Sequence, residues 1–202
     1  MIRVFTLLLC MLNCIVSASA EDIYSLAQYG DTNGLVAMIE AGADINARDS
    51  QGNTALHKAV YPTAKLLLSY TPDVNARNMK GQTPLHLAVL FEGEQLVELL
   101  LINGADANAY DNKRIVPLHK AKYAAAKLLL SYAADPNFQD EEGNTPLHLN
   151  ARHGYHKTVE LLISAGADPT ILDDRGRTPL DHAISKGIDS PTAKVLRQLG
   201  VY

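Results

Sequence analysis

Apolar residues recur along this chain in short helical patterns separated by polar turns. Leu85, Ala88 and Val89 lie at spacings of three and four, and a second apolar block follows at residues 96–100. These spacings place the apolar side chains on one face of a helix. Gly104 and Asp106 then supply residue types that favour a helix end and a tight turn. The pattern predicts a unit of helix, short turn, antiparallel helix and projecting hairpin loop.

The same unit recurs along the chain. A four-residue phrase stands at Thr54–His57, Thr83–His86, Val116–His119, Thr145–His148 and, with aspartate at its last position, Thr178–Asp181. A second phrase recurs in register with it and ends at Asp44, Asp73, Asp106, Asp135 and Asp168. One helix pair buries too little apolar surface to fold alone, so neighbouring units must stack. The repetition therefore predicts an elongated solenoid.

The phrases Gly-x-Thr-Pro-Leu-His-x-Ala, Val-x-Leu-Leu and Gly-Ala-Asp resemble the signature of the ankyrin repeat. The resemblance covers essentially all of residues 21–202 and is closest at 80–112. It implies an all-α ankyrin-repeat solenoid of about six helix-turn-helix units with projecting hairpin loops. The units are expected at about 21–50, 51–79, 80–112, 113–141, 142–174 and 175–202, and the first and last, which match least well, are expected to be caps.

The repeat phrases are alternately 29 and 33 residues apart. Residues 54–78 and 116–140 share their sequence features at an offset of 62, which indicates that a two-repeat block was duplicated with its deletion already present. Four missing residues amount to about one helical turn. Pro62 marks the restart of the second helix after Tyr61. By propensity alone, residues 118–132 could form one continuous helix; the related copy predicts a break near residues 122–125.

The recurring phrase has a clear structural interpretation. Threonine can cap a helix by accepting a backbone N–H, and the proline that usually follows suits the first helical position. These capping residues are Thr54, Thr83, Thr145 and Thr178. Histidine at the fourth position is expected to bond to the neighbouring turn and tie successive hairpins together. These structural histidines are His57, His86, His119 and His148.

Residues 1–20 have the layout of a secretory signal peptide. Arg3 is followed by an apolar core at 4–16 and by Ala18-Ser19-Ala20 before Glu21. A core of thirteen residues at ~1.5 Å each is too short for a ~30 Å bilayer, which disfavours a membrane anchor. A lipoprotein signal is also disfavoured, because Leu9 and not a small residue precedes Cys10. We expect an exported protein, periplasmic or secreted.

Removal of this segment changes the chemistry open to the chain. Both cysteines, Cys10 and Cys14, lie within it, so the remainder has no disulfide, thiolate nucleophile or cysteine metal ligand. Arg3 is its only charged residue, and 17 basic residues then face 22 acidic ones, a net charge of −5. Because a phosphate-tracking surface needs the opposite balance, nucleic acid is not an expected partner. We also expect no membrane association after cleavage, and a monomer.

Catalytic and metal-binding patterns are absent from the sequence after residue 20. It contains no nucleophile elbow, phosphate loop or zinc-protease helix, so no catalytic residue, cofactor or metal is predicted. One alternative is a metal-binding or enzymatic site at His148, His153 and His156. Gly154 interrupts that cluster, and no carboxylate or cysteine completes a usual ligand set. A second alternative is a structural protein without a specific partner.

The resemblance implies a non-catalytic module that binds a protein partner through hairpin tips and a concave groove lined by the first helix of each unit. We assign large side chains at first-helix positions to this groove: Tyr61, Leu90, Phe91, Tyr123, Arg152 and His153. Aromatic residues of this kind are enriched among binding hot spots; alternatively, Tyr61 and Tyr123 fill the gap left by the short repeats. The candidate tip residues are Met79, Lys80, Arg114 and Arg175. Arg114 stands where other tips carry glycine, which predicts a strained left-handed residue or a different turn.

Overall fold

The computed structural model describes residues 19–91, 93–185 and 190–198, and in these ranges the helices come in pairs and no residue forms a strand. The pairs, in chain order, are α2 (Ser19–Tyr29) with α3 (Thr32–Glu40), α4 (Ala55–Lys58) with α5 (Tyr61–Leu68), α6 (Pro84–Phe91) with α7 (Glu94–Ile102), the 3-10 helix η1 (Pro117–His119) with α8 (Tyr123–Ser131), α9 (Pro146–His153) with α10 (His156–Ser164), and α11 (Pro179–Ile184) with α12 (Pro191–Gln198).

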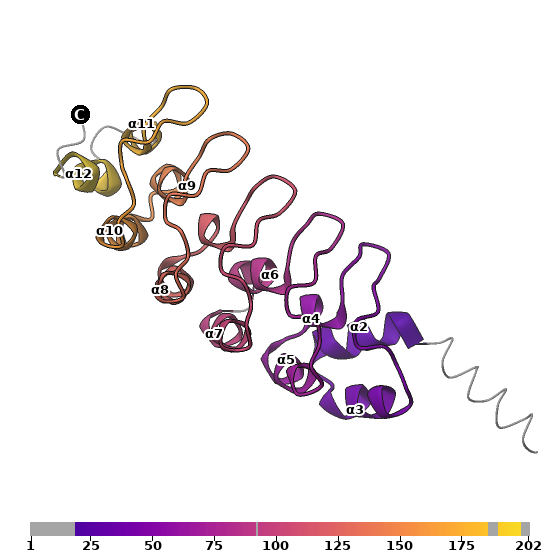
Figure 1. Ribbon diagram of the computed structural model, residues 1–202. Coiled ribbons are helices and arrows are strands. Elements are labelled where there is room, and N and C mark those ends of the chain that lie inside the picture. The colour runs from indigo at the N-terminus through magenta and orange to yellow at the C-terminus, as the bar shows by residue number, and fades with distance from the viewer. Residues whose placement is uncertain (1–18, 92, 186–189, 199–202) are drawn as a thin grey trace, which may run out of the picture.

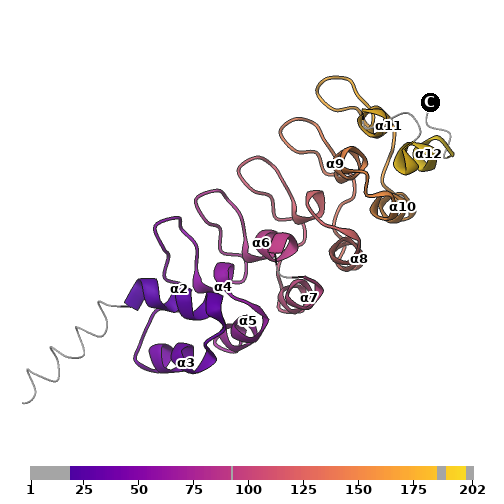
Figure 2. The same cartoon turned by 180° about the vertical axis from the view of Figure 1, so that it is seen from behind.

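The pairs stack side by side in one elongated array (Figure 1). The first members form an inner row, in which α2 contacts α4, α4 contacts α6, and α6 and α9 both contact η1. The second members form an outer row from α3 to α12 in the same way. Hairpin loops project from the same side of every pair, as the view from behind also shows (Figure 2). The all-α solenoid expected from the repeats is confirmed.

Repeated leucines form a core that runs through the whole array. Leu85, Leu118 and Leu147 stand at the same position of successive inner elements, and each is completely buried. The outer row buries an equivalent series: Leu35, Leu67, Leu100, Leu129, Leu162 and Leu196. Each such side chain stabilises the fold by about 1.5–3 kcal/mol on burial. The units are therefore joined by contacts between neighbours and not by a single central core.

Shortening in the 29-residue intervals falls on the inner helices. The inner element has four residues in α4 and three in η1, against eight in both α6 and α9. The outer helices α5 and α8 keep eight and nine residues. The deletion therefore removes the last turn of an inner helix and leaves the outer row almost unchanged.

Residues 118–132 contain two elements, and the break between them lies at 120–122 instead of the expected 122–125. Helix α8 already begins at Tyr123, and Lys122 before it is extended, with φ −81° and ψ 175°. Ala121 is buried, as is Ala59 at the equivalent position of the other short unit. Because that burial holds the backbone extended, packing overrides the helix propensity of the alanine run.

Asparagine side chains join the outer ends of the units. Asn75 Oδ1 accepts the N–H of Asp106 at 2.8 Å, and its Nδ2 donates to the carbonyl of Gly104 at 3.0 Å. The side-chain oxygens of Asn46, Asn108 and Asn137 accept equivalent bonds from the next unit. These bonds fix the spacing of successive units on the side away from the hairpin tips.

Most of the expected signal peptide lies outside the described residues, and Ser19 and Ala20 form the start of α2. In the described ranges, no helix combines the length and apolar character needed to cross a membrane.

Candidate binding groove

The concave side of the solenoid is formed by the hairpin loops and the inner helices. Neighbouring loops are joined near their tips by backbone bonds, from Met79 N to Gln51 O and from Asn112 N to Lys80 O, both 2.9 Å. The same bond recurs from Glu141 N to Lys113 O at 3.2 Å and from Asp174 N to Glu142 O at 3.0 Å. The loops therefore form one continuous wall, in which a backbone bond joins each loop to the next near the tips.

The recurring histidines tie each inner helix to the next loop. Thr83 N donates to His86 Nδ1 at 3.1 Å, and His86 Nε2 lies 2.9 Å from the carbonyl of Ile115 in the following unit. Since a backbone N–H can only donate, Nδ1 is unprotonated and Nε2 carries the hydrogen. The bridges from the other units run from His57 to Gln82, from His119 to Asn144 and from His148 to Arg177.

Burial keeps these histidines neutral. Loss of hydration lowers the pKa of His86 from its ordinary value, against the opposing effect of its bond to Ile115. Burial lowers the pKa of the other three bridging histidines in the same way. Protonation would place a proton on Nδ1, which accepts the backbone N–H of a threonine or, at His119, of Val116. The bridge therefore needs the neutral ring.

The threonine caps differ in detail from the expected pattern. At Thr178 the hydroxyl accepts the N–H of Asp181 at 3.2 Å. At Thr54, Thr83 and Thr145 the hydroxyl lies 2.9 Å from the ring nitrogen of the histidine three residues later. In the last unit Asp181 Oδ2 accepts the N–H of Thr178 at 2.9 Å, as the histidine nitrogen does elsewhere.

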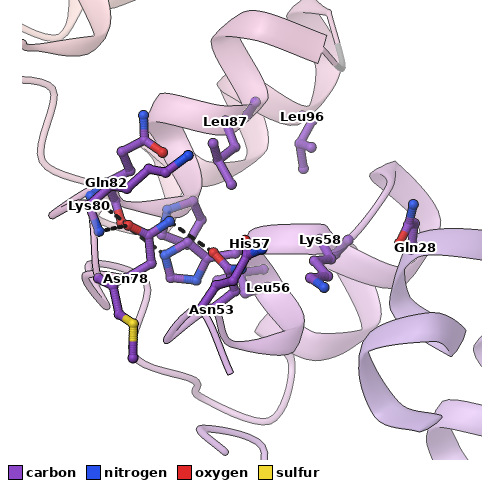
Figure 3. Close-up of a pocket in the computed structure, with 15 residues that line it drawn as sticks. Gln28, Asn53, Leu56, His57, Lys58, Asn78, Lys80, Gln82, Leu87 and Leu96 are labelled. Carbon is purple, nitrogen blue, oxygen red and sulfur yellow. Dashed lines mark hydrogen bonds between the residues drawn. The ribbon is translucent and has the colours of Figure 1, made fainter. Parts of the chain in front are cut away.

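A cavity of about 780 Å³ opens over the short helix α4. We call it the first cavity. Its apolar part is formed by Leu56, Leu87, Ala88 and Leu96. Its polar lining comes from α2, from α4 and from the loops on either side, and includes Gln28, Gln51, Asn53, Lys58, Asn78, Lys80 and Gln82; the apolar Met79 lies on the same rim. Figure 3 shows Leu87 and Leu96 on one side of the opening, with Lys80 and Gln82 on the loop side.

A second, smaller cavity of about 330 Å³ opens over η1. It is lined by Lys113, Lys120, Glu141, Glu142, Leu149 and Arg152, among others. Lys120 and Leu149 stand 62 residues after Lys58 and Leu87 of the first cavity, which is the offset of the duplicated block. Both cavities thus lie where an inner helix lacks its last turn.

The hairpin tip at Arg114, which lacks glycine, keeps the same turn conformation as the other tips. Arg114 adopts the left-handed φ of +55°, where Gly81 has +75° and Gly143 has +76°. Its guanidinium lies 5.1 Å from the ring centre of Phe138 and 5.9 Å from that of Tyr110. These cation–π contacts are worth about 0.5–1 kcal/mol each at exposed sites and offset part of the backbone strain.

Six of the predicted binding residues fall into three groups. Met79 and Lys80 line the first cavity, and Arg152 lines the second. Leu90 and His153 lie near the C-terminal ends of α6 and α9, where the His153 ring stacks on Tyr155. Arg175 is exposed at the last tip. The Phe91 side chain lies outside the part of the chain that the structure describes.

The assignment of Tyr61 and Tyr123 to first helices is wrong. Tyr61 is the first residue of α5 and Tyr123 the first residue of α8, so both begin outer helices. They are 39% and 47% exposed and line neither cavity. The misplacement follows from the deletion, because the inner helices end before these residues.

Several cavity residues were not identified from the sequence. Leu56, Leu87 and Leu96 fit the apolar pattern of the core, and Gln28 and Lys58 belong to no motif. The alternation of 29 and 33 residues was the signal that could have revealed the cavity. To use this signal, one would have to know that the missing turn belonged to the inner helix and not to the outer one.

The histidine cluster does not form a ligand set. Both ring nitrogens of His148 bond to backbone atoms, those of Thr145 and Arg177. In the described ranges, no three His, Cys, Asp or Glu side chains are grouped so as to hold a metal ion. The site alternative at His148, His153 and His156 therefore finds no support in the geometry.

The fold and this groove define a helical-repeat protein, and comparison with known proteins identifies the family. A family model described as ankyrin repeats, three copies, matches residues 23–111 and 118–201, so the chain belongs to the ankyrin-repeat family. It is 34% identical over 148 residues to inversin from Gallus gallus, a match that covers 70% of this chain and 11% of inversin.

Two further relatives show the same partial overlap. An ankyrin-repeat protein of Acanthamoeba polyphaga mimivirus is 33% identical over 62% of this chain and 18% of its own length. Neurogenic locus notch homolog protein 1 of Mus musculus is 35% identical over 63% of this chain and 5% of its own length. The chain spans less than a fifth of each of these three relatives, so the similarity is to their repeat regions.

Proposed function

We propose that this chain is a non-catalytic module that binds a protein partner in the groove between its hairpin tips and inner helices. Ankyrin repeats generally mediate protein–protein interaction. The observation that carries the proposal is the first cavity, where Leu87 of α6 is partly exposed over the buried Leu56, Ala88 and Leu96, beside a polar rim. A concave site with an apolar floor and a few polar groups is the usual form of a binding site.

Rigidity of the loops supports the same function. The wall is held by bonds between loops and by four histidine bridges, so its surface is ordered before a partner arrives. Preorganisation reduces the entropy cost of association, about 0.5–1.5 kcal/mol for each mobile side chain that must be fixed.

Site-specific cross-linking in the native host tests the groove assignment. A photoreactive residue at Met79, which is exposed at the rim, is expected to form a discrete adduct with a partner protein. The same residue at Glu98, exposed on the outer helix α7, is the matched control. Equal adducts at both positions, or adducts at Glu98 alone, would rule out the groove as the contact surface.

We further propose that residues 1–20 direct export and are removed. The charged, apolar and small-residue segments of this stretch support the proposal. Mass spectrometry of the native protein is expected to show an N-terminus at Glu21, in the periplasm or the medium. Ala20→Arg should block processing. A native protein that retains residues 1–20 would contradict the proposal.

We also propose that the processed chain is monomeric and binds neither nucleic acid nor membranes. Its net charge of −5 supports the absence of nucleic-acid binding, because phosphates would be repelled. Sedimentation of the processed protein should give one species near the monomer mass, with no shift on addition of DNA or of lipid vesicles.

A further inference from the structure

We infer that the first cavity binds an extended segment of a protein partner that carries an aliphatic side chain flanked by carboxylates. This inference rests on the proposed function and names the chemistry of the partner. Three features of the cavity support it: its apolar floor, the charge on its rim and the pairing of the loop backbones.

The floor selects an aliphatic side chain. Leu56 is buried in α4, while Leu87 of α6 is partly exposed toward the space left by the missing turn. Leu96 of α7 closes the same side. No Phe, Tyr or Trp lies among the described residues that line the cavity, and its apolar contact surface is made by leucines and the Met79 thioether. Such a surface adapts to a branched aliphatic group.

The rim carries positive charge. Lys58 and Lys80 line the cavity, and none of its described lining residues is aspartate or glutamate. Lys58 is already paired with Asp49 at 2.9 Å, behind the opening. Lys80 is exposed and forms no ion pair within the described ranges, so it supplies the uncompensated charge. A segment with carboxylates beside its aliphatic residue complements this rim.

Backbone pairing decides how the segment is held. Met79 N and Lys80 O already bond to the neighbouring loops, so the segment cannot add to the wall as another strand. Recognition must come from side chains. The amides of Gln28, Gln51 and Gln82 around the opening can each donate and accept, which suits the exposed backbone of an extended segment.

The second cavity shows that the charge is specific to the first. Its residues equivalent to Met79 and Lys80 are Glu141 and Glu142, 62 positions later. These two glutamates would repel an acidic segment at that part of the rim. The chain thus contains a matched site on the same scaffold, in which two glutamates replace Met79 and Lys80 beside Lys113, Lys120 and Arg152.

Binding of the full chain to an array of 12-residue peptides tests the inference. Each peptide carries a central Leu, Phe or Ser flanked by Glu, Lys or Ser residues. We expect the strongest retention for Leu between Glu residues, weakening as salt is raised. Lys80→Glu should weaken it about tenfold and Met79→Gln several-fold. Glu142→Lys, the matched change in the second cavity, should leave the ranking unchanged.

All three substituted residues are exposed, so equal melting temperatures can be verified for the variants. A preference for Lys-flanked peptides, or a ranking that survives Lys80→Glu, would overturn the inference. So would an equal loss with Glu142→Lys. If the Met79 adduct formed in the host but its contacting segment proved basic, the proposed function would stand and this inference alone would fail.

Discussion

At the scale of single residues, the bridging histidines make the fold sensitive to acid. Each must stay neutral to accept the N–H of the residue three positions earlier, a threonine in three units and Val116 in the fourth, and to donate to the next loop. Burial lowers the pKa of all four below the ordinary 6.5. The unfolded chain therefore takes up protons that the folded chain excludes. The stability they confer is present above pH 6.5 and is lost as pH falls below it.

We predict that the free energy of unfolding changes little between pH 7.5 and pH 6.5 and falls steeply between pH 6.5 and pH 5.5. Each histidine can contribute a loss of up to about 1.4 kcal/mol per pH unit below 6.5. Asp49 does not titrate in this window: burial raises its pKa, but bonds from Lys58 and Asn53 outweigh that and lower it to about 2. Urea unfolding at a series of pH values measures the loss.

His86→Asn is the control for this effect. The asparagine oxygen can accept the Thr83 N–H, as Asp181 Oδ2 does for Thr178, but it does not titrate. The variant should be less stable at pH 7.5, because the bond to Ile115 is lost, and its stability should depend less on pH. A pH dependence identical to that of the parent would contradict the role assigned to His86.

Left-handed residues in the short units are a second local feature. Thr71 and Ala133 have φ of 52° and 59° at the position where Gly104 and Gly166 end the outer helices of the longer units. A left-handed conformation costs a residue with a side chain about 1–2 kcal/mol.

We predict that Ala133→Gly stabilises the protein by about 0.5–1 kcal/mol, because the relieved strain exceeds the added chain entropy of glycine. Thermal or urea unfolding measures the change. Ala165→Gly is the control: Ala165 has a φ of −91° and gains nothing from glycine. If both variants were equally destabilised, strain at Ala133 would be excluded.

At the scale of elements, the sequence predicted the helix pairs but not which helix was shortened. Because four residues make about one helical turn, their loss from either helix leaves the remaining side chains on the same faces. Pro62 indicated a restart but fits the first turn of α5 equally well with Tyr61 inside that helix. Tyr61 and Tyr123 were therefore placed on the wrong elements. The buried Ala59 and Ala121 fix the true boundary, and burial is a tertiary property.

Helix α9 carries one polar residue, Asn150, at a buried position that favours an apolar side chain. Asn150 stands where α6 has the buried Ala88, and it is itself buried. Its Nδ2 donates to the Pro146 carbonyl at 2.9 Å, but its Oδ1 has no partner among the described residues. A buried oxygen without a hydrogen bond costs about 1–3 kcal/mol.

We predict that Asn150→Ala stabilises the protein by about 1 kcal/mol, through relief of that cost and a better helix propensity. Ala88→Asn, the reverse change at the equivalent site of α6, should destabilise it. Paired urea titrations measure both. A loss of stability in Asn150→Ala would show that the amide makes a contact the fold requires.

At the scale of the whole molecule, the repeated sequence phrase determines the architecture, whereas contacts between neighbouring units determine the first cavity. The recurring phrase was enough to predict the solenoid, because each unit contacts only the next. The first cavity was not predictable in the same way. It forms between α2, α4, α6 and α7, and its floor consists of leucines that the pattern alone assigns to the core.

A linear array should also unfold in parts. Stability in such a protein is approximately a sum over units and their interfaces. The inner row depends at its centre on η1, which has only three residues and connects α6 to α9. Leu118 in η1 is completely buried, so Leu118→Ala should cost about 2–5 kcal/mol.

We predict that Leu118→Ala separates the unfolding of the two halves. Hydrogen exchange followed by mass spectrometry should show faster exchange in 113–141 and different protection on either side of it. Leu180→Ala, in the last pair, should instead accelerate exchange only near the C-terminal end. Uniform acceleration along the whole chain in both variants would mean that the units unfold as one body. The groove would then owe its rigidity to global cooperativity, and not to the bonds between neighbouring loops.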